Sequence, residues 1–433
     1  MAVVKTDLFR LSASQTAELI RSNHISAQEY AHALLERVRE RDPQVRAWVY
    51  LDEEAVLEQA QKLDQLSPEE RGPLHGVAIG VKDIFLTRDM PTRYNSRLHA
   101  YDGNAAADSA AVSVLRAAGA IIFGKTATTE FAAMTEGGPC SNPHNPKHTP
   151  GGSSSGSAAS VADCQVPVSI GTQTGGSIVR PGSFNGCYAF KPTWGTISTE
   201  GVGRFSISAD TPGFYARTVD DMELLSRVFQ LPAPLRTTIS VAGSKIAFIK
   251  THIWPNAGPG TVAAWNDAQQ LLANAGAHVL DVSMPDEFAR CAEWREIIVS
   301  EEARAAFMPK YREDKTKLHA DIVTLVENAH PPGRAAILEA HDSVAQLRAQ
   351  WDRFASQYDI ILTPSAVDEA PEGLESTGTA IFCCMWTILH VPAMNVPGFR
   401  GACGLPIGLT VVGARYTDMD VLSAGKAVGK VFN

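Results

Sequence analysis

The amino-acid sequence predicts a layered α/β fold. Strand-like apolar runs alternate with helical stretches along the chain, an order typical of a β-sheet with helices packed against it. The chain has 433 residues, of which 45% are hydrophobic and 20% charged, so it can bury a large core. No internal repeat, long charge run or proline-rich linker marks a boundary, and we expect one domain over residues 1–433.

Capping signals and hydrophobic spacing define the elements of the N-terminal half. Ser26 and Glu29 form a capping box at the start of a helix over "SAQEYAHALLERVRERD". The stretch "ADSAAVSVLRAAGA" indicates a second helix that ends near Gly119. Short strand-like runs are expected at residues 45–51, 76–85, 120–123 and 166–171.

The C-terminal half continues the same alternation. Helical stretches are expected at residues 262–275 and 334–355. Strands are expected at "KIAFIK", "HVLDVS", "DIILTPS" and "LPIGLTVVG". The segment Glu313–Gly333 is polar at its start and ends near two adjacent prolines, so it is a weak candidate for a domain boundary.

Composition argues against several classes of protein. The net charge of −9 disfavours a nucleic-acid binder, which needs a basic face. The seven cysteines show no CxxC spacing, which favours reduced thiols, and Cys383 and Cys384 are expected in the core. No signal peptide is visible, and no apolar run approaches the ~20 residues that span a bilayer. We therefore expect a cytoplasmic protein without membrane or nucleic-acid partners.

Two short motifs suggest chemistry that their context does not support. Gly119–Thr126 has the letters of a phosphate-binding loop, but its four central residues are apolar and form a strand themselves. Cys140, His144 and His148 could ligate zinc, but the stretch "PCSNPHNPKHTPGG" around them carries four prolines and no fourth ligand stands nearby. We expect a turn-rich loop here, and neither a cofactor nor a metal.

Three further motifs suggest nucleophilic catalysis. Lys82 lies in "GVKDIF", Ser153 in "GGSSSGSAA" and Ser177 in "GTQTGGSIVRP". The last motif follows a strand, where exposed backbone amides can converge on one point and glycines leave them unobstructed. Apolar residues flank Lys82, which favours its burial and the loss of its proton. Each motif alone is typical of a turn or a surface charge, but here the three occur together.

In their order along the chain and in their amino-acid sequences, these motifs resemble the amidase signature family of Ser-Ser-Lys hydrolases. The stretches "GPLHGVAIGVKD", "FKPTWGTIS" and "SADTPGFYARTVDD" extend the match, and Ser153 and Ser177 are 24 residues apart, as in the family. The resemblance runs from Ala27 to the C-terminus, with a signature core at about residues 70–225 and a weaker helical stretch at about 255–352. It implies the amidase-signature fold, a large mixed β-sheet flanked on both faces by α-helices.

The resemblance also implies a mechanism. Ser177 is the expected nucleophile, and a neutral Lys82 is the expected base that acts on it through Ser153. The backbone amides expected to bind the oxyanion are those of Thr174, Gly175 and Gly176. In the family, the serine that matches Ser153 takes part in a cis peptide bond, so we expect the Ser/Gly stretch 149–160 to be an ordered and largely buried loop.

Arg180 bears on the choice of substrate. Its place three residues after Ser177 resembles the malonamidase branch, in which an arginine holds a substrate carboxylate. The alternative is that Arg180 pairs with a buried acidic group and supports the loop. Further candidate substrate contacts are Ser154, Met134 and Trp386, and for Trp386 core packing is an equal alternative.

We expect an amidase that hydrolyses the C–N bond of small amides, and the same acyl-enzyme route would suit carbamates (urethanes), esters and aryl amides. The nearest competing hypothesis is the glutaminase subunit of a tRNA-dependent amidotransferase, which the short chain and the arginine spacing disfavour. A catalytically silent binding protein with this fold would have lost the lysine or a serine, and a phosphate-loop enzyme is the weakest alternative. A small molecule is the expected partner, and the sequence is compatible with a homodimer.

Overall fold

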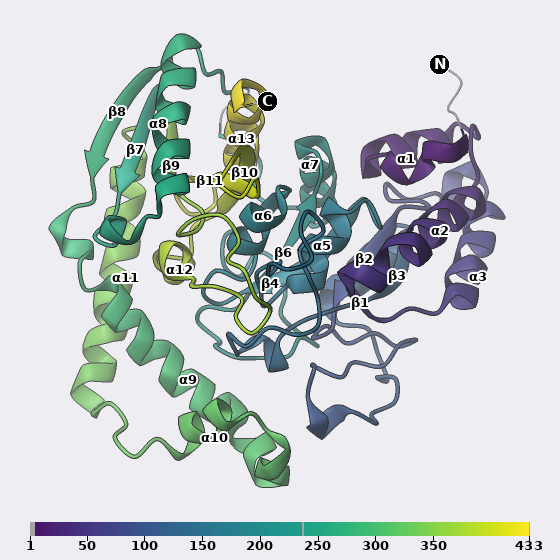
Figure 1. The fold of residues 1–433 in the computed structure, drawn as a ribbon, viewed down its shortest axis with the longest axis horizontal. Helices are drawn as coiled ribbons and strands as arrows, with labels where there is room; N and C mark the ends of the chain where they lie inside the picture. Colours follow the sequence, from purple (N-terminus) through teal and green to yellow (C-terminus); the bar gives the residue numbers. More distant parts are fainter. Residues whose placement is uncertain (1–4, 236–237, 433) are drawn as a thin grey trace.

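The chain is organised around one β-sheet (Figure 1). The computed structural model describes residues 5–235 and 238–432. Within these residues the sheet has eleven strands in the order β1-β3-β2-β4-β6-β5-β10-β11-β9-β7-β8. The strands are β1 Trp48–Tyr50, β2 Ala78–Lys82, β3 Ile121–Thr126, β4 Val168–Gln173, β5 Tyr188–Lys191, β6 Thr211–Ala216, β7 Lys245–Lys250, β8 His278–Ser283, β9 Ile360–Pro364, β10 Ala393–Arg400 and β11 Pro406–Val412.

The sheet is mixed, as the resemblance implied. β2 is parallel to β3 and β4, and β7 is parallel to β8 and β9, whereas the other neighbouring strands are antiparallel. Parallel neighbours need a crossover connection. The α-helices of the described residues are α1 Ala13–Arg21, α2 Ala27–Val45, α3 Glu53–Asp64, α4 Ala110–Ala117, α5 Ser155–Ala162, α6 Val179–Asn185, α7 Val219–Val228, α8 Pro259–Asn274, α9 Cys291–Asp314, α10 Ala320–Glu327, α11 Arg334–Ala355, α12 Ile381–Ile388 and α13 Asp418–Phe432.

Helices cover both faces of the sheet, as the side chains of β2 demonstrate. Ile79 and Val81 belong to a buried cluster with residues of α4, α7 and α13, whereas Ala78 belongs to another with residues of α2, α3 and α5. Successive strand residues point to opposite faces, and every residue of β2 is buried. The predicted α/β architecture is therefore confirmed.

The segment of weaker resemblance contributes α8 and β8 and then forms a helical arm, α9 to α11, which extends beyond the sheet (Figure 1). The two long helices α9 and α11 pack against each other, and α10 packs on α9. Phe307 of α9 and Ile322 of α10 form a cluster with Leu98 and Phe131 of the rest of the molecule. The candidate boundary Glu313–Gly333 is the bend of this arm around α10. A single domain remains a prediction.

Predicted and observed elements agree well in the helices and less well in the first strand. Helix α11 has the predicted bounds, and Ser26 caps α2 in a capping box with Glu29. The run 45–51 contributes only three residues to β1, because Val45 still belongs to α2. Among the described helices, none is long and apolar enough to cross a membrane.

The residues that match a phosphate-binding loop or could ligate zinc make structural contacts in the fold. Lys125 is buried in β3, where its Nζ lies 3.0 Å from a carboxylate oxygen of Asp83 and donates to Thr92 Oγ1 at 2.6 Å. The imidazoles of His144 and His148 contact backbone carbonyl oxygens at 2.9 and 2.8 Å. Residues 5–235 and 238–432 contain no group of three or more side chains that could hold a metal ion.

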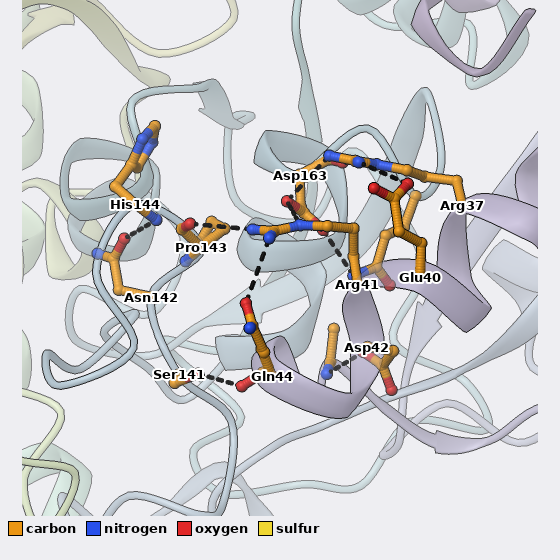
Figure 2. A network of polar contacts seen from close by, with 12 residues as sticks. Arg37, Glu40, Arg41, Asp42, Gln44, Ser141, Asn142, Pro143, His144 and Asp163 are labelled. Atoms are coloured by element: carbon orange, nitrogen blue, oxygen red, sulfur yellow. Dashed lines mark hydrogen bonds and ion pairs between the residues drawn. The ribbon is translucent and has the colours of Figure 1, made fainter. Parts of the chain in front are cut away.

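The C-terminal end of α2 clamps the segment that contains the serine-rich stretch 149–160. Figure 2 shows Arg37 and Arg41 converging on Asp163, which is buried just after this stretch. Arg41 also donates to the backbone carbonyl of Pro143, which precedes the stretch, at 3.3 Å. One helix thus holds both ends of the loop.

Replacing Asp163 by alanine should destabilise the fold. The change removes the acceptor of both guanidinium groups, and losing a hydrogen bond to a charged group typically costs about 1.5–3 kcal/mol of unfolding free energy. We expect a lower thermal midpoint in circular dichroism. Glu40→Ala is the matched control, because Glu40 pairs with Arg37 at the surface and such pairs contribute about 0–1 kcal/mol. Equal midpoints for the two variants would contradict the clamp.

Candidate active site

The three motifs singled out in the sequence meet where β2 and β4 end. Lys82 is the last residue of β2, and β4 ends directly before Thr174. The two strands are parallel neighbours, with Val81 opposite Ile170, so their C-terminal ends lie at the same edge of the sheet. The loop of Ser153 passes beside this edge and continues into α5.

Lys82 is bound to two hydroxyl groups inside the protein. Its side chain is fully buried, and Nζ lies 2.7 Å from Ser153 Oγ and 2.9 Å from Thr172 Oγ1. Burial disfavours the ammonium form and holds the pKa of Lys82 well below its usual value, while the negative charge of Asp210 acts in the opposite direction. Lys82 is therefore buried, as its apolar neighbours in the sequence predicted.

The serine-rich stretch is a buried loop that passes into α5 at Ser155. Every residue of 149–160 is buried, and the peptide bond between Gly152 and Ser153 is cis. Arg180 donates from Nη2 to the carbonyl oxygen of Gly152 at 2.6 Å and to Thr377 Oγ1 at 3.3 Å. The guanidinium of α6 therefore fixes the backbone directly before Ser153.

The loop that carries Ser177 is held from several sides. The side-chain oxygen of Gln173 accepts hydrogen bonds from the N–H groups of Ile178 and Val179 at 2.9 and 3.0 Å. The hydroxyl of Tyr215 donates to the carbonyl oxygen of Ser177 at 2.9 Å. Thr387 donates to the carbonyl oxygen of Gly175 at 2.8 Å, and because a trans peptide is planar, the following N–H points to the opposite side.

A cavity of about 450 Å³ opens at this point of the fold. Its lining includes Ser153, Ser177 and the three predicted oxyanion-binding residues, Thr174, Gly175 and Gly176. Within the described residues the hydroxyl of Ser177 makes no hydrogen bond, in contrast to the hydroxyl of Ser153. The nucleophile predicted from the sequence is therefore accessible from the cavity.

The cavity has walls from both the sheet region and the helical arm. Arg180 of α6 and Met134 line it on one side, and Arg295 and Glu296 of α9 line it on the other. Arg295 Nη2 lies 3.5 Å from the position that a Cβ at Gly175 would occupy. The guanidinium of Arg295 contacts Glu296, the next residue in the chain, at 3.0 Å.

Arg180 does not have the acidic partner that the structural alternative required. No ion pair of Arg180 with a carboxylate occurs in residues 5–235 and 238–432, although the residue is only 3% exposed. Its contacts are neutral oxygen atoms, and the buried Nε has no hydrogen-bond partner. The alternative role of Arg180 therefore holds only in its second part: the described residues show no buried acid paired with it, but Arg180 does support the loop of Ser153.

Two of the predicted substrate contacts lie outside the cavity. Ser154 is buried below it and donates to the carbonyl oxygen of Thr172 at 3.1 Å. Trp386 packs in the core against Trp351, with ring centroids 4.8 Å apart. The reason is helical phase: Cys384 of α12 lines the cavity, and a residue two positions later points to the opposite side of a helix. Cys384 is also less buried than the core thiol that we expected.

Three residues of the site were not predicted. Thr172 and Asp210 lie within motifs that carry the family resemblance, so their positions were visible although their contacts were not. Arg295 lies in the stretch of weaker resemblance, and no local pattern distinguishes it from the other arginines of α9.

Comparisons with known proteins agree with this geometry. A family model described as Amidase matches residues 29–422. A glutamyl-tRNA(Gln) amidotransferase subunit of Thermobifida fusca (strain YX) is 36% identical over 479 residues, covering 98% of this chain and 96% of that protein. The protein of the same name from Salinispora tropica is 38% identical over 305 residues, covering 65% of this chain and 62% of that protein. This second match spans less than two thirds of the relative's length.

Structural superposition on a solved protein indicates the same family. A crystal structure of an amidase superposes with a TM-score of 0.85 at 28% sequence identity, covering 96% of this chain and 98% of that chain. The family model covers most of the sequence, including all three motifs at Lys82, Ser153 and Ser177. This chain belongs to the amidase family.

Proposed function

We propose that this chain hydrolyses the C–N bond of a small amide that carries a carboxylate, through an acyl-enzyme on Ser177. Membership of the family supports hydrolysis of amide C–N bonds. The observation that carries the substrate class is the pair of guanidinium groups, Arg180 and Arg295, in the cavity beside Ser177. Hydrolysis of urethanes or aryl amides stays a prediction without a structural argument of its own.

In the proposed reaction, Lys82 acts as the base. Its neutral amine accepts the proton of Ser153, which takes the proton of Ser177, and Ser177 Oγ then attacks the amide carbon. The backbone amides of Thr174, Gly175 and Gly176 bind the oxyanion that develops. The proton returns through Ser153 to the leaving amine, and water then hydrolyses the acyl-enzyme. The contact between Lys82 and Ser153 at 2.7 Å supports the first transfer.

The second transfer needs a contact between the two serine hydroxyls. Ser153 and Ser177 line the same cavity, but no hydrogen bond joins them in the part of the chain that the structure describes. Catalytic hydrogen bonds are often formed only in the complex with substrate. We therefore assign this contact to the substrate-bound state.

A bound carboxylate would supply a negative charge to the two guanidinium groups that line the cavity. Arg180 is buried beside neutral oxygen atoms, and a buried charge is stable only when it is paired or well hydrogen-bonded. Among the described residues Arg295 is paired only with Glu296, whose side chain is 69% exposed, and pairs of that kind contribute little. Guanidinium groups bind carboxylates through two parallel hydrogen bonds, so an anionic substrate fits both side chains.

Two substrates meet this description. Glutamine is favoured by the comparisons, because the relatives from Thermobifida fusca and Salinispora tropica are amidotransferase subunits for glutamyl-tRNA(Gln). The length of the chain is weak evidence against this function, since the alignment covers 96% of the Thermobifida fusca protein. Malonamate is the second candidate, supported by the spacing of Ser177 and Arg180. In the first case the relatives' names, as subunits, imply partner proteins.

A panel of amides tests the proposed substrate class. Release of ammonia or aniline should be measured with glutamine, malonamate, an uncharged anilide and a carbamate, with and without amidotransferase partner proteins. We expect the carboxylate-bearing amides to have the higher kcat/KM. Faster hydrolysis of the anilide or the carbamate would contradict the substrate class, and glutamine against malonamate separates the two candidates.

Ser177→Ala and Lys82→Met should each abolish turnover while the fold persists. A general base contributes about 10²–10⁴-fold and the nucleophile at least as much, so we expect a fall of at least about 10²-fold in kcat. Labelling by a fluorophosphonate probe gives a second measurement: it should be lost in Ser177→Ala and slowed in Lys82→Met.

Lys191→Met is the matched control for the lysine. Lys191 is also fully buried, but its Nζ donates to the backbone carbonyls of Val391 and Pro192 and it does not line the cavity. Folded Lys191→Met protein should be labelled at the rate of the unmodified chain. Equal slowing by both lysine changes would count against a specific role of Lys82.

Arg295→Gln should weaken the use of carboxylate-bearing amides selectively. Loss of a charged hydrogen bond typically costs about 1.5–3 kcal/mol, which corresponds to a rise in KM of about 10- to 100-fold. Arg290→Gln is the control, because Arg290 lies beside the same helix, pairs with Glu293 and Glu339, and does not line the cavity. A rise in KM of the same size for an uncharged amide would contradict this role.

A further inference from the structure

A buried carboxylate lies directly behind the nucleophile loop. Asp210 is 9% exposed, and its Oδ1 accepts a hydrogen bond from Thr174 Oγ1 at 2.5 Å. Its Oδ2 accepts from the backbone N–H groups of Phe205 and Ser206 at 2.8 and 3.0 Å. Thr174 provides one of the amides proposed for the oxyanion, so Asp210 is bound to the catalytic loop itself.

The pairing of β4 with β6 brings this carboxylate to the end of β4, where Thr172 binds Lys82. Thr172 stands opposite Pro212 and Gln173 opposite Thr211, so Asp210 follows opposite Thr174. Thr172 is the second-last residue of β4, and Thr174 directly follows the strand. Thr172 accepts from Lys82, and Thr174 donates to Asp210.

Asp210 is the charged group that acts on the amine. Its negative charge raises the pKa of Lys82 against the effect of burial, and the positive charge of Lys82 in turn lowers the pKa of Asp210. Burial nevertheless raises the pKa of Asp210 to about 6. The hydrogen-bond contacts of Lys82 are the hydroxyls of Ser153 and Thr172, and the adjacent Asp83 is paired with Lys125.

The helical arm fixes the turn that presents Asp210. Glu302 of α9 accepts hydrogen bonds from the hydroxyl of Ser206 at 2.5 Å and from the backbone N–H of Ser208 at 2.9 Å. The carboxylate of Asp210 therefore has a defined position relative to the nucleophile loop on one side and to α9 on the other.

We propose that Asp210 is a positioning residue with two tasks: it holds the Thr174 loop, and it is the counter-charge for the Lys82 ammonium. This inference rests on the proposed acyl-enzyme mechanism. When Ser177 attacks, its proton passes through Ser153 to the amine, which becomes an ammonium while the negative charge moves to the oxyanion. A carboxylate held in a fixed position stabilises that ammonium.

The test is the pH profile of Asp210→Asn. The amide has the shape of the carboxylate, and the Thr174 hydroxyl can turn to accept from it, so the variant removes the charge and retains the contact. Only the neutral form of Lys82 can act as base, and loss of the nearby negative charge lowers the pKa of Lys82. The acid limb of kcat/KM should therefore move to lower pH by about one unit, and kcat on the plateau should fall by about tenfold or more.

Thr174→Val is the matched control. It removes the hydroxyl that binds Asp210 but retains the charge, so kcat should fall while the acid limb stays in place. Asp210→Ser supplies a second neutral variant where Asp210→Asn fails to fold. An acid limb that coincides with that of the unmodified chain in a folded neutral variant would overturn the inference. Failure of the mechanism itself is a separate result, seen as full activity of Ser177→Ala.

Discussion

The active site depends on a lysine amine that the fold removes from water and places beside a hydroxyl. Lys82 is fully buried, and its amine lies between Ser153 and Thr172. Taking an ammonium out of water is unfavourable unless a counter-charge lies against it, so an amine held by neutral hydroxyls tends to lose its proton. The surrounding structure maintains this contact: parallel β2 and β4 bring Lys82 to Thr172, and the buried loop 149–160 brings Ser153 to both.

A comparison of three fully buried lysines explains why only one is suited to be a base. Burial lowers the pKa of Lys125, but the carboxylate of Asp83 lies against its amine and acts in the opposite direction, which makes Lys125 a structural link. Burial lowers the pKa of Lys191 to about 7, but its amine donates to backbone carbonyls, which cannot supply a proton. Lys82 has hydroxyl partners, with Asp210 held farther away by Thr174. Burial alone therefore does not distinguish the base; the chemistry of its contacts does.

The sequence predicted the parts of the site that depend on local pattern. The apolar flanks of Lys82 predicted its burial. The family resemblance of the sequences around Ser153 and Ser177 implied that the three motifs meet. Contacts that depend on strand pairing could not be predicted from the sequence. Asp210 meets Thr174 only through the antiparallel register of β4 and β6. The sequence left two roles open for Trp386, substrate contact and core packing, for a related reason. The side of a short helix that faces the core is not defined by a sequence that is apolar on every side.

The proposed catalytic residues and one of the two proposed carboxylate-binding arginines come from different parts of the chain. The proposed base, relay and nucleophile lie between Lys82 and Ser177, in the stretch of strong resemblance, whereas Arg295 comes from the helical arm. The same helix supplies Glu302, which fixes the turn before Asp210, so α9 both lines the cavity and supports the catalytic loop. A change that shifts α9 would therefore alter binding and catalysis together, while a change confined to the Arg295 side chain would alter binding alone. The arm is thus the part of this fold in which a new substrate preference can arise without loss of the buried amine.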